Sequence, residues 1–253
     1  MRKALLSIIV LLAISSCKSN LVVSDFKARS LGNDQSQQTT DSSLVKFIQP
    51  YKEQLDEVMG ETIIMSDAEM VRKLPESEMT NCVADMFLEN CRQMGAQLDG
   101  NPYPDIAYIN FFSLRANLPK GKVSLGKLYE IFPFENQIVY ILVSGENMMK
   151  FAQITAHRGG DCVSGMRMTI TKDGNVGAFE INGQSVDKNK YYWIVTSDYI
   201  ANGGDNMTMF ANPKKRIDSG FKVRDSFIDY MRSEHAAGRT LSGKLDGRIS
   251  NEQ

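Results

Sequence analysis

The stretch from residue 191 to residue 210, YYWIVTSDYIANGGDNMTMF, constrains the fold more than any other part of the chain. Its first six residues are all aromatic or β-branched, which predicts a packed β-strand over residues 191–196. The strand leads to Tyr199 and then to a loop in which Gly203-Gly204 precedes Asp205. Consecutive glycines tolerate positive φ and let backbone N–H groups approach a ligand closely. An aromatic ring beside such a loop and a carboxylate can form a binding rim, although Gly-Gly after a strand is more often only a turn.

The first 17 residues have the organisation of a bacterial lipoprotein signal. Arg2 and Lys3 supply the positive start, and residues 4–14 form an apolar segment too short to cross a bilayer as a stable helix. The segment ends in Ile-Ser-Ser-Cys, which resembles the lipobox that precedes a lipidated cysteine. We therefore predict that Cys17 is lipidated and that acyl chains anchor the protein to the membrane of the cell envelope, in the periplasm or on the exterior. The alternative is an ordinary secretory signal with an incidental cysteine.

The composition beyond the signal predicts a polar tether followed by one folded domain. Residues 18–43 contain the run NDQSQQTTDSS and few residues that could enter a core, which is typical of a flexible linker. We expect the folded domain over residues 44–250. The chain has 253 residues, with 29 Lys and Arg against 30 Asp and Glu. Because this balanced charge gives no bulk attraction to nucleic acid, we expect no nucleic-acid partner.

Mixed periodicity within the domain predicts an α+β fold in which helices flank a mixed sheet. Helical spacing of apolar residues is strongest at 77–94, and apolar runs such as IVYILV at 138–143 predict buried strands. Helices dominate early and strands cluster late, which favours the α+β class. Further helices are expected at 44–59 (begun or kinked by Pro50), 124–132, 145–157 and 224–235. Further strands are expected at 61–65, 106–110, 163–171, 178–181 and 191–196, with a hairpin turn at 172–175.

Three cysteines remain after Cys17, namely Cys82, Cys91 and Cys162. Cys82 and Cys91 lie nine positions apart on one expected helix and project to opposite sides, so they should not pair with each other. We expect all three to be buried structural thiols.

Three segments and the end of the domain together resemble one known family. Residues 76–85 (ESEMTNCVAD) resemble its ES-x-L-x-N-L-x-A-D helix entry, and residues 121–136 (GKVSLGKLYEIFPFEN) resemble its G-x-I-x-x-x-x-L-x-x-x-x-P-F-x-N segment. Residues 199–210 (YIANGGDNMTMF) resemble its aromatic-x-x-x-GGD loop, and Gly247-Arg248-Ile249 matches its closing Gly-Arg-Ile. In this order the segments resemble the C-terminal domain of 5′-nucleotidases and the related periplasmic UDP-sugar hydrolases, over residues 44–249.

The resemblance implies a domain that recognises nucleotides. In the family, two aromatic rings sandwich the base, and the matching positions here are Phe134 and Tyr199. Stacking tolerates different bases because every base has a π-face. Other matching positions are Asn136 for a hydrogen bond to the base, Asp205 for the ribose hydroxyls, Gly165 for close backbone contact with the ligand, and Arg115 for the charged end of the substrate.

The match is weaker where the family holds the phosphate. The family commonly has Asn-Gly-Gly-x-Arg at this point, whereas residues 110–115 read NFFSLR. Two phenylalanines replace the glycines, which changes the local backbone that aims Arg115. Arg72 is only a loose counterpart of another family arginine. Tyr199 replaces the more common Phe, and it still stacks while adding a hydroxyl. Base binding is therefore expected to transfer better than phosphate binding.

Family members carry catalysis in a separate N-terminal metallophosphoesterase domain, in which Asp, Asn and His side chains hold two metal ions. The chain contains neither an Asp-x-His nor a Gly-Asn-His-Glu motif, and its two histidines, His157 and His235, fall on separate expected helices. The near P-loop at residues 121–128 has Leu128 in place of the Mg²⁺-binding Ser or Thr. We therefore expect no catalytic residue, metal ion or cofactor in this chain.

The leading hypothesis is the substrate-binding half of a split 5′-nucleotidase system. This lipoprotein would bind a nucleotide or nucleoside, while a separately encoded metallophosphoesterase chain would supply the divalent metal ions and the hydrolysis, in nucleotide catabolism. A second hypothesis is a stand-alone nucleoside- or nucleotide-binding lipoprotein of the envelope without catalysis. A third is a degenerate domain that serves only protein contacts; the retained stacking aromatics argue against it, and the lost glycines before Arg115 argue for it.

Overall fold

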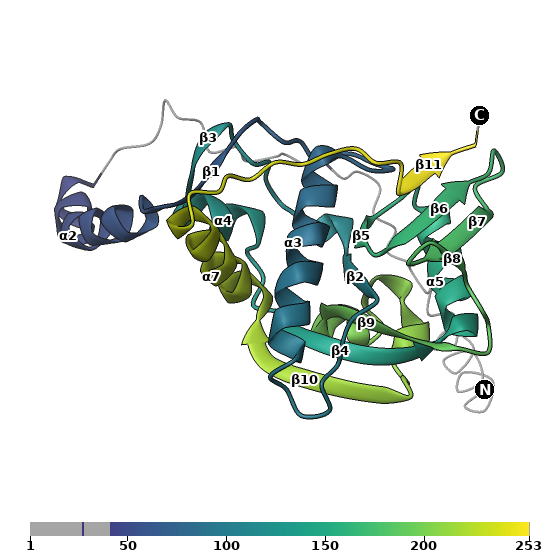
Figure 1. Cartoon of the computed structure of the whole chain (residues 1–253). Helices are drawn as coiled ribbons and strands as arrows, with labels where there is room; N and C mark the ends of the chain where they lie inside the picture. The colour runs from purple at the N-terminus through teal and green to yellow at the C-terminus, as the bar shows by residue number, and fades with distance from the viewer. Residues whose placement is uncertain (1–26, 28–40, 253) are drawn as a thin grey trace, which may run out of the picture. The chain divides into compact units, whose positions relative to one another are not determined.

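The computed structural model describes residue 27 and residues 41–252 (Figure 1). The signal predicted for residues 1–17, including Cys17, and most of the tether predicted for residues 18–43 lie outside the described residues. One compact unit begins at Gln49, and the start of the folded domain at residue 44 stays a prediction. No helix in the described part of the chain is long and apolar enough to cross a membrane.

The described chain contains helices and strands in mixed order. The helices are α2 (Ser42–Met59), α3 (Glu78–Gly95), α4 (Leu125–Ile131), α5 (Gly145–His157), α6 (Asp198–Ala201) and α7 (Val223–Ala236), with the short 3-10 helices η2 (Phe111–Ser113), η3 (Gly204–Asn206) and η4 (Thr208–Phe210). The strands are β1 (Thr62–Ser66), β2 (Ile106–Ile109), β3 (Gly121–Ser124), β4 (Gln137–Ser144), β5 (Cys162–Ser164), β6 (Met166–Ile170), β7 (Val176–Ile181), β8 (Gln184–Ser185), β9 (Tyr191–Ser197), β10 (Lys215–Lys222) and β11 (Ile249–Asn251).

The helices begin where the sequence offers capping side chains. The Ser77 hydroxyl accepts the Thr80 N–H at 3.1 Å, and the Thr80 hydroxyl accepts the Ser77 N–H at 2.8 Å, which forms a capping box at the start of α3. Ser124 caps α4, where its hydroxyl accepts the Lys127 N–H at 3.1 Å. In α2, Pro50 lies inside the helix and therefore does not begin it, and no residue of α2 is buried.

The strands form mixed sheets, as the sequence predicted. A five-stranded sheet has the order β10-β4-β9-β2-β5, in which β2 and β9 run parallel while the other pairs are antiparallel. A four-stranded sheet has the order β11-β6-β7-β8, with β11 and β6 parallel, and β1 pairs with β3 in a two-stranded sheet. The hairpin predicted at residues 172–175 joins β6 to β7.

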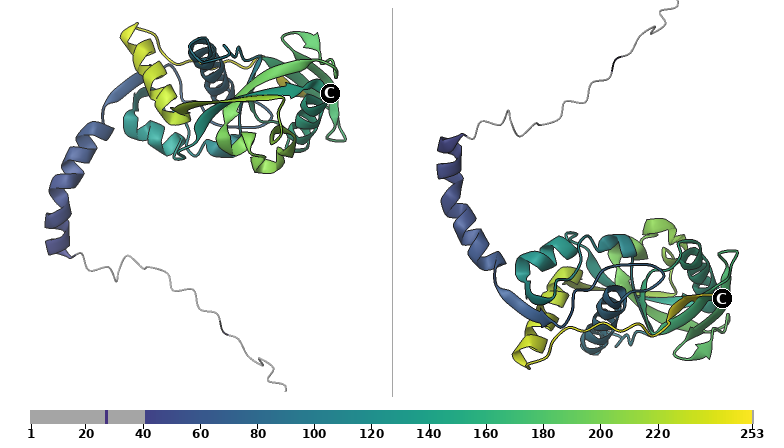
Figure 2. Two further views of the ribbon diagram at one scale, coloured as in Figure 1. Left: turned by 90° about the horizontal axis from the view of Figure 1, so that it is seen from below. Right: turned by 90° about the horizontal axis from the view of Figure 1, so that it is seen from above.

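The central strands of the five-stranded sheet are buried on both faces. On β2, Ile109 enters one core cluster whereas its neighbour Tyr108 enters the other. The views in Figure 2 show helices on both sides of these strands. A strand covered on both faces reads as a continuous apolar run instead of an alternating one. This burial explains why runs such as IVYILV could be assigned to strands from the sequence.

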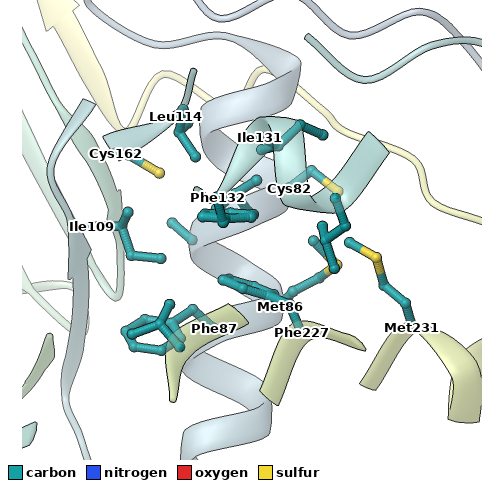
Figure 3. Close-up of a cluster of buried hydrophobic side chains, with 14 of the residues drawn as sticks. Cys82, Met86, Phe87, Ile109, Leu114, Ile131, Phe132, Cys162, Phe227 and Met231 are labelled. Atoms are coloured by element: carbon teal, nitrogen blue, oxygen red, sulfur yellow. The ribbon is translucent and has the colours of Figure 1, made fainter. Parts of the chain in front are cut away.

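Aromatic side chains join α3, α4 and α7 in the first of these clusters, shown in Figure 3. The ring of Phe227 on α7 lies 5.7 Å from that of Phe87 on α3, and it stacks at 4.7 Å on Phe132, which follows α4. Stacked or tilted rings at these separations add to the free energy gained by burying their area. The cluster therefore fixes the end of α4, where the chain turns towards residues 133–136.

The three cysteines predicted to be structural thiols are buried and free. Burial raises the pKa of Cys82 to about 12 and the pKa of Cys162 well above its ordinary value. The Cys162 thiol donates to the Thr80 carbonyl at 3.0 Å. Thiols that stay protonated and enclosed behave as small hydrophobic side chains.

The prediction of a single strand over residues 163–171 is wrong, because the strand is interrupted at Gly165. The strand β5 belongs to the five-stranded sheet, whereas β6 belongs to the four-stranded one. Gly165 has φ +84°, and a Cβ atom there would lie 2.0 Å from the Asp105 carbonyl oxygen. Only glycine accepts both this φ and this approach. Gly165 is thus the corner at which the chain changes sheets.

Sequence patterns missed one long polar strand, β10. The strand β10, KRIDSGFK, pairs with β4 at one edge of the five-stranded sheet, and none of its residues is buried. Edge strands often carry charged residues, which discourage pairing with other chains. Such a strand has no apolar periodicity from which it could be predicted. The short strands β3, β8 and β11 were missed too.

The start of α3 is fastened to the end of the described chain. The Glu76 carboxylate accepts the backbone N–H groups of Gly247 and Arg248, each at 3.0 Å. The Arg248 guanidinium donates to both Asp85 oxygens, at 2.7 and 2.9 Å, and also to Asp246. These carboxylates raise the pKa of Arg248 against the opposing effect of its burial. Glu76, Asp85, Asp246 and Arg248 are called the clasp below.

Candidate functional site

The residues singled out from the sequence converge where the central strands of the five-stranded sheet end. Because β2 and β9 are parallel, both end on this side of the sheet. The strand β4 begins there because it runs antiparallel to β9, with Ile138 opposite Ser197. Asn110 follows β2, Asn136 precedes β4, and α6 follows β9. The edge at which neighbouring parallel strands end is a common place for ligand sites in α/β sheets.

A cavity of about 320 Å³ opens at this edge. This volume lies at the lower end of the range of small-molecule sites. The cavity is lined by Asn110, Phe112, Ser113, Arg115, Phe134, Asn136, Tyr199 and Asp205. Five of the six predicted binding residues are among them, although they come from three separate segments of the chain.

Aromatic rings form the walls of the cavity. Phe134 is 45% exposed and Tyr199 is 47% exposed, which is unusually open for large aromatic side chains. Phe112, at 58% exposed, adds a third ring. Accessible rings around one cavity provide faces on which a planar group can stack. The arrangement suits the stacking roles predicted for Phe134 and Tyr199.

The Gly-Gly-Asp loop is held against Tyr199. A Cβ atom on Gly204 would lie 2.6 Å from atoms of the Tyr199 ring, so only glycine fits there. The Tyr199 hydroxyl donates to Asp205 Oδ1 at 2.9 Å. Asp205 itself has φ 52° and ψ 37°, a left-handed conformation that is uncommon for residues other than glycine. The loop therefore presents the Asp205 carboxylate in a fixed position.

Asn110 donates from Nδ2 to the second oxygen of Asp205, at 2.8 Å. Each Asp205 oxygen thus has one donor from the protein and keeps acceptor capacity for a further one. The side-chain amide of Asn136 and the exposed guanidinium of Arg115 make no hydrogen bond or ion pair within residues 41–252, although both line the cavity. Polar groups that are available beside a stacking surface can fix the orientation of a ligand.

Gly165, the sixth predicted binding residue, is not brought together with the others. It follows β5, whose Ser164 lies opposite Ala107 near the start of β2, whereas Asn110 follows the end of β2. Gly165 instead lines a polar cavity beside the clasp. Its role as a backbone contact for the ligand stays a prediction, and the role visible in the structure is that of a corner.

Asp161 lies beneath the site and contacts one wall of it directly. It is 2% exposed, and its Oδ1 accepts the backbone N–H of Phe111 at 2.6 Å, which holds η2 at the rim of the cavity. Oδ1 also accepts the Cys162 N–H at 3.1 Å, and Oδ2 accepts the Tyr108 hydroxyl at 3.0 Å. Burial raises the pKa of Asp161 to about 6, partly offset by these donors.

Arg158 connects Asp161 to the Gly-Gly-Asp loop. From the C-terminal end of α5, its Nη1 approaches Asp161 Oδ2 at 3.4 Å and the Tyr108 hydroxyl at 3.3 Å. Its Nη2 donates to the backbone carbonyl of Asp205 in the Gly-Gly-Asp loop. The guanidinium therefore lies between a buried carboxyl group and the loop that carries a predicted ligand-binding residue.

The segment that carries Phe134 and Asn136 is anchored on its other side by Glu135. The Glu135 carboxylate pairs with Lys222 and with the buried Arg224, which together hold the pKa of Glu135 below its usual value. The Asn136 carbonyl accepts the Val223 N–H at 2.9 Å. The junction between β10 and α7 thus fixes this segment.

Sequence reasoning missed several residues that build the site. Asn110 and Ser113 lie in the segment that was noted for its lost glycines, and the position of Asn110 after a buried strand was an available signal. Asp161 and Arg158 gave no such signal, because they come from the end of α5 and contact the site only through the fold. Arg72, the loose arginine candidate, donates to the Phe111 carbonyl at 3.4 Å and lies 5.0 Å from its ring.

The described residues do not fit a metal centre. No three His, Cys, Asp or Glu side chains among residue 27 and residues 41–252 gather closely enough to hold a metal ion. The carboxylate at the site, Asp205, is instead hydrogen-bonded to an amide and a phenol. The chemistry that these residues offer is stacking, hydrogen bonding and a cationic side chain.

Known proteins with similar sequences include nucleotide-processing enzymes. The family model for the 5′-nucleotidase C-terminal domain matches residues 58–212. The chain is 24% identical over 258 residues to the trifunctional nucleotide phosphoesterase protein YfkN of Bacillus subtilis. The matched region covers 93% of this chain and 16% of that protein. It is 21% identical over 200 residues to the 5′-nucleotidase of Vibrio cholerae, which covers 76% of this chain and 34% of that protein. The chain therefore spans well under half the length of either relative.

Solved structures share the fold. The 5′-nucleotidase precursor from Thermus thermophilus matches with a TM-score of 0.68 and 26% identity, covering 83% of this chain and 42% of that chain. A putative 5′-nucleotidase from Staphylococcus aureus, solved in complex with alpha-ketoglutarate, matches with a TM-score of 0.65 and 19% identity, covering 87% of this chain and 46% of that one. The predicted fold class is confirmed.

Proposed function

Because the chain belongs to the family of 5′-nucleotidase C-terminal domains, we propose that it binds a nucleoside or nucleotide and takes part in nucleotide hydrolysis with a separately encoded metallophosphoesterase chain. The observation that carries the proposal is the convergence of Phe134, Tyr199 and Asp205 on one cavity of about 320 Å³. The base would stack between the two rings, the ribose hydroxyls would donate to Asp205, and Asn136 would bind the edge of the base.

Arg115 would meet the charged end of the ligand. Its guanidinium is exposed and lines the same cavity. Because Phe111 and Phe112 stand where the family commonly has glycines, the backbone offers less room to a phosphate, and we propose that most of the affinity comes from the nucleoside. The hydrolysis itself would use divalent metal ions held by the partner chain.

The proposed location is the cell envelope. The lipobox-like segment before Cys17 supports a lipid anchor, and residues 18–43 would serve as the tether between anchor and domain. Metabolic labelling with a radioactive fatty acid tests this step, because replacement of Cys17 by Ala should abolish incorporation.

Calorimetric titration of the purified chain with adenosine, AMP and UDP-glucose tests the binding site. Stacking of a base on an aromatic side chain contributes about 1–3 kcal/mol, so Phe134→Ala and Tyr199→Ala should each weaken binding by about tenfold or more. Tyr191→Ala is a matched control, because Tyr191 is also 47% exposed but lies outside the cavity. Wild-type affinity in both site variants would contradict the proposal.

Co-expression with a metallophosphoesterase chain tests the second part of the proposal. We expect the two chains to co-purify and nucleotide hydrolysis to exceed that of the phosphoesterase alone. Tight ligand binding without any gain in hydrolysis would instead favour the alternative, a stand-alone nucleoside- or nucleotide-binding lipoprotein of the envelope. Absence of binding by either preparation would favour a domain that serves protein contacts.

A further inference from the structure

We propose that Asp161 is a positioning residue that ties together two walls of the ligand site, so that its negative charge sets the affinity of the site. The Asp161 carboxyl group lies below the cavity and is not among the residues that line it. Its effect on a nucleoside ligand rests on the proposed function, whereas its effect on the walls does not.

The first wall is η2, which carries Phe112 and Ser113 to the cavity. The bond from the Phe111 N–H to Asp161 Oδ1, at 2.6 Å, fixes the first residue of this turn. A turn with two adjacent phenylalanines lacks the close backbone approach that glycines would allow. A buried carboxylate that accepts its first N–H group therefore sets its position from below.

The second wall is the Gly-Gly-Asp loop, in which Asp205 and Asn206 both have positive φ. Arg158 donates to the Asp205 carbonyl and lies against Asp161 Oδ2. A loop held in left-handed conformations persists only where surrounding contacts determine it. The carboxylate holds Arg158, and Arg158 holds the loop.

Within residues 41–252, the groups that hydrogen-bond to Asp161 are all donors: the N–H groups of Phe111 and Cys162, the Tyr108 hydroxyl and the Arg158 guanidinium. A carboxylate accepts from all of them, whereas a protonated carboxyl group would bring its own O–H donor among them. The titratable or charged groups that face it are Tyr108 from β2, Arg158 from the end of α5, the Cys162 thiol from β5 and Asp205 from the loop.

The pKa of about 6 places the loss of this charge within an accessible range. We expect the wild-type chain to bind adenosine several-fold more weakly at pH 5 than at pH 7.5, since adenosine itself carries no charge over this range. In Asp161→Asn, an acceptor for Phe111 remains but Arg158 loses its anion, so binding should be weak at both pH values. Asp105→Asn is the matched control, because Asp105 also accepts a backbone N–H, from Trp193, but lies near the other end of β2.

Hydrogen–deuterium exchange of the free protein provides a readout that needs no ligand. At pH 7.5, we expect the amides of residues 203–207 to exchange about tenfold faster in Asp161→Asn than in wild type. In Asp161→Ala, the amides of residues 111–114 should also exchange faster than in wild type. Amides within α3 should be unchanged in both variants, which shows that the fold is intact.

The outcomes separate this proposal from the proposed function. Accelerated exchange without adenosine binding by any variant would support the positioning role and count against nucleoside binding. Unchanged exchange at both walls, or Asp161→Asn binding with the affinity and pH dependence of wild type, would overturn the positioning role.

Discussion

At the scale of single residues, Asp161 carries a cost that stability measurements should reveal. Its pKa is raised from 3.8 to about 6 by burial, so the folded chain holds this proton more tightly than the unfolded chain does. The stabilising contribution of the protonated group is therefore fully present below pH 4 and is lost as the pH rises through about 6. The difference corresponds to about 3 kcal/mol.

Urea unfolding at several pH values tests this sign. We expect the difference in unfolding free energy between Asp161→Asn and wild type to shift in favour of the variant as the pH rises from 4 to 7. An equal difference at both pH values would contradict a raised pKa. The cost falls beneath the candidate site, where Asp161 accepts the N–H of the first residue of η2.

The residues of the site differ in how well the sequence could predict them. Five residues belong to segments whose sequence resembles that of a known family. All five line one cavity: Phe134, Asn136, Tyr199, Asp205 and Arg115. Asp161 and Arg158 act through contacts across about 50 residues of sequence, which no local pattern encodes. Gly165 also matches the family sequence, but it lies apart from the other five; its contact with the ligand stays a prediction, and the structure shows it as the corner between two sheets.

At the scale of elements, the break between β5 and β6 should depend on Gly165. In Gly165→Ala, the new Cβ atom would meet the Asp105 carbonyl oxygen at 2.0 Å, and alanine would also be held at φ +84°. Backbone strain and overlap together predict a loss of about 3 kcal/mol or more of unfolding free energy. Gly174→Ala is the matched control, because φ is +75° there but no atom lies within 4 Å of its Cβ position.

The control should lose only about 1–2 kcal/mol, the cost of the left-handed conformation alone. Equal losses of unfolding free energy in the two variants would show that the close approach to Asp105 does not matter.

The strands differ in how well the sequence could predict them. Apolar runs predicted the strands that are buried on both faces, whereas the end of β5 and the polar β10 depend on backbone approach and on a place at the sheet edge.

At the scale of the whole molecule, the clasp joins residues more than 160 positions apart. Arg248→Ala would leave Asp85 and Asp246 without their shared cation. Because Arg248 is 7% exposed while Asp85 is partly exposed, we expect a loss of about 2–3 kcal/mol. Arg239→Ala is the control, since its pair with Glu234 lies at the surface and should matter little.

Unfolding followed by fluorescence of the single tryptophan and by circular dichroism tests the effect on the whole body. Trp193 lies on β9, far along the sequence from the clasp. We expect both signals to move together to lower urea concentration in Arg248→Ala. A shift confined to one signal, or an equal shift in Arg239→Ala, would show that the clasp is only a local contact.

The position of the cavity at the ends of the central strands has a consequence for how the specificity of such a site can change. Its walls are short connections after β2, before β4 and after β9, while the strands that support them are buried on both faces. We expect that each connection can be exchanged without altering the packed strands. Grafting one connection at a time from a relative would therefore transplant single features of recognition onto an unchanged scaffold.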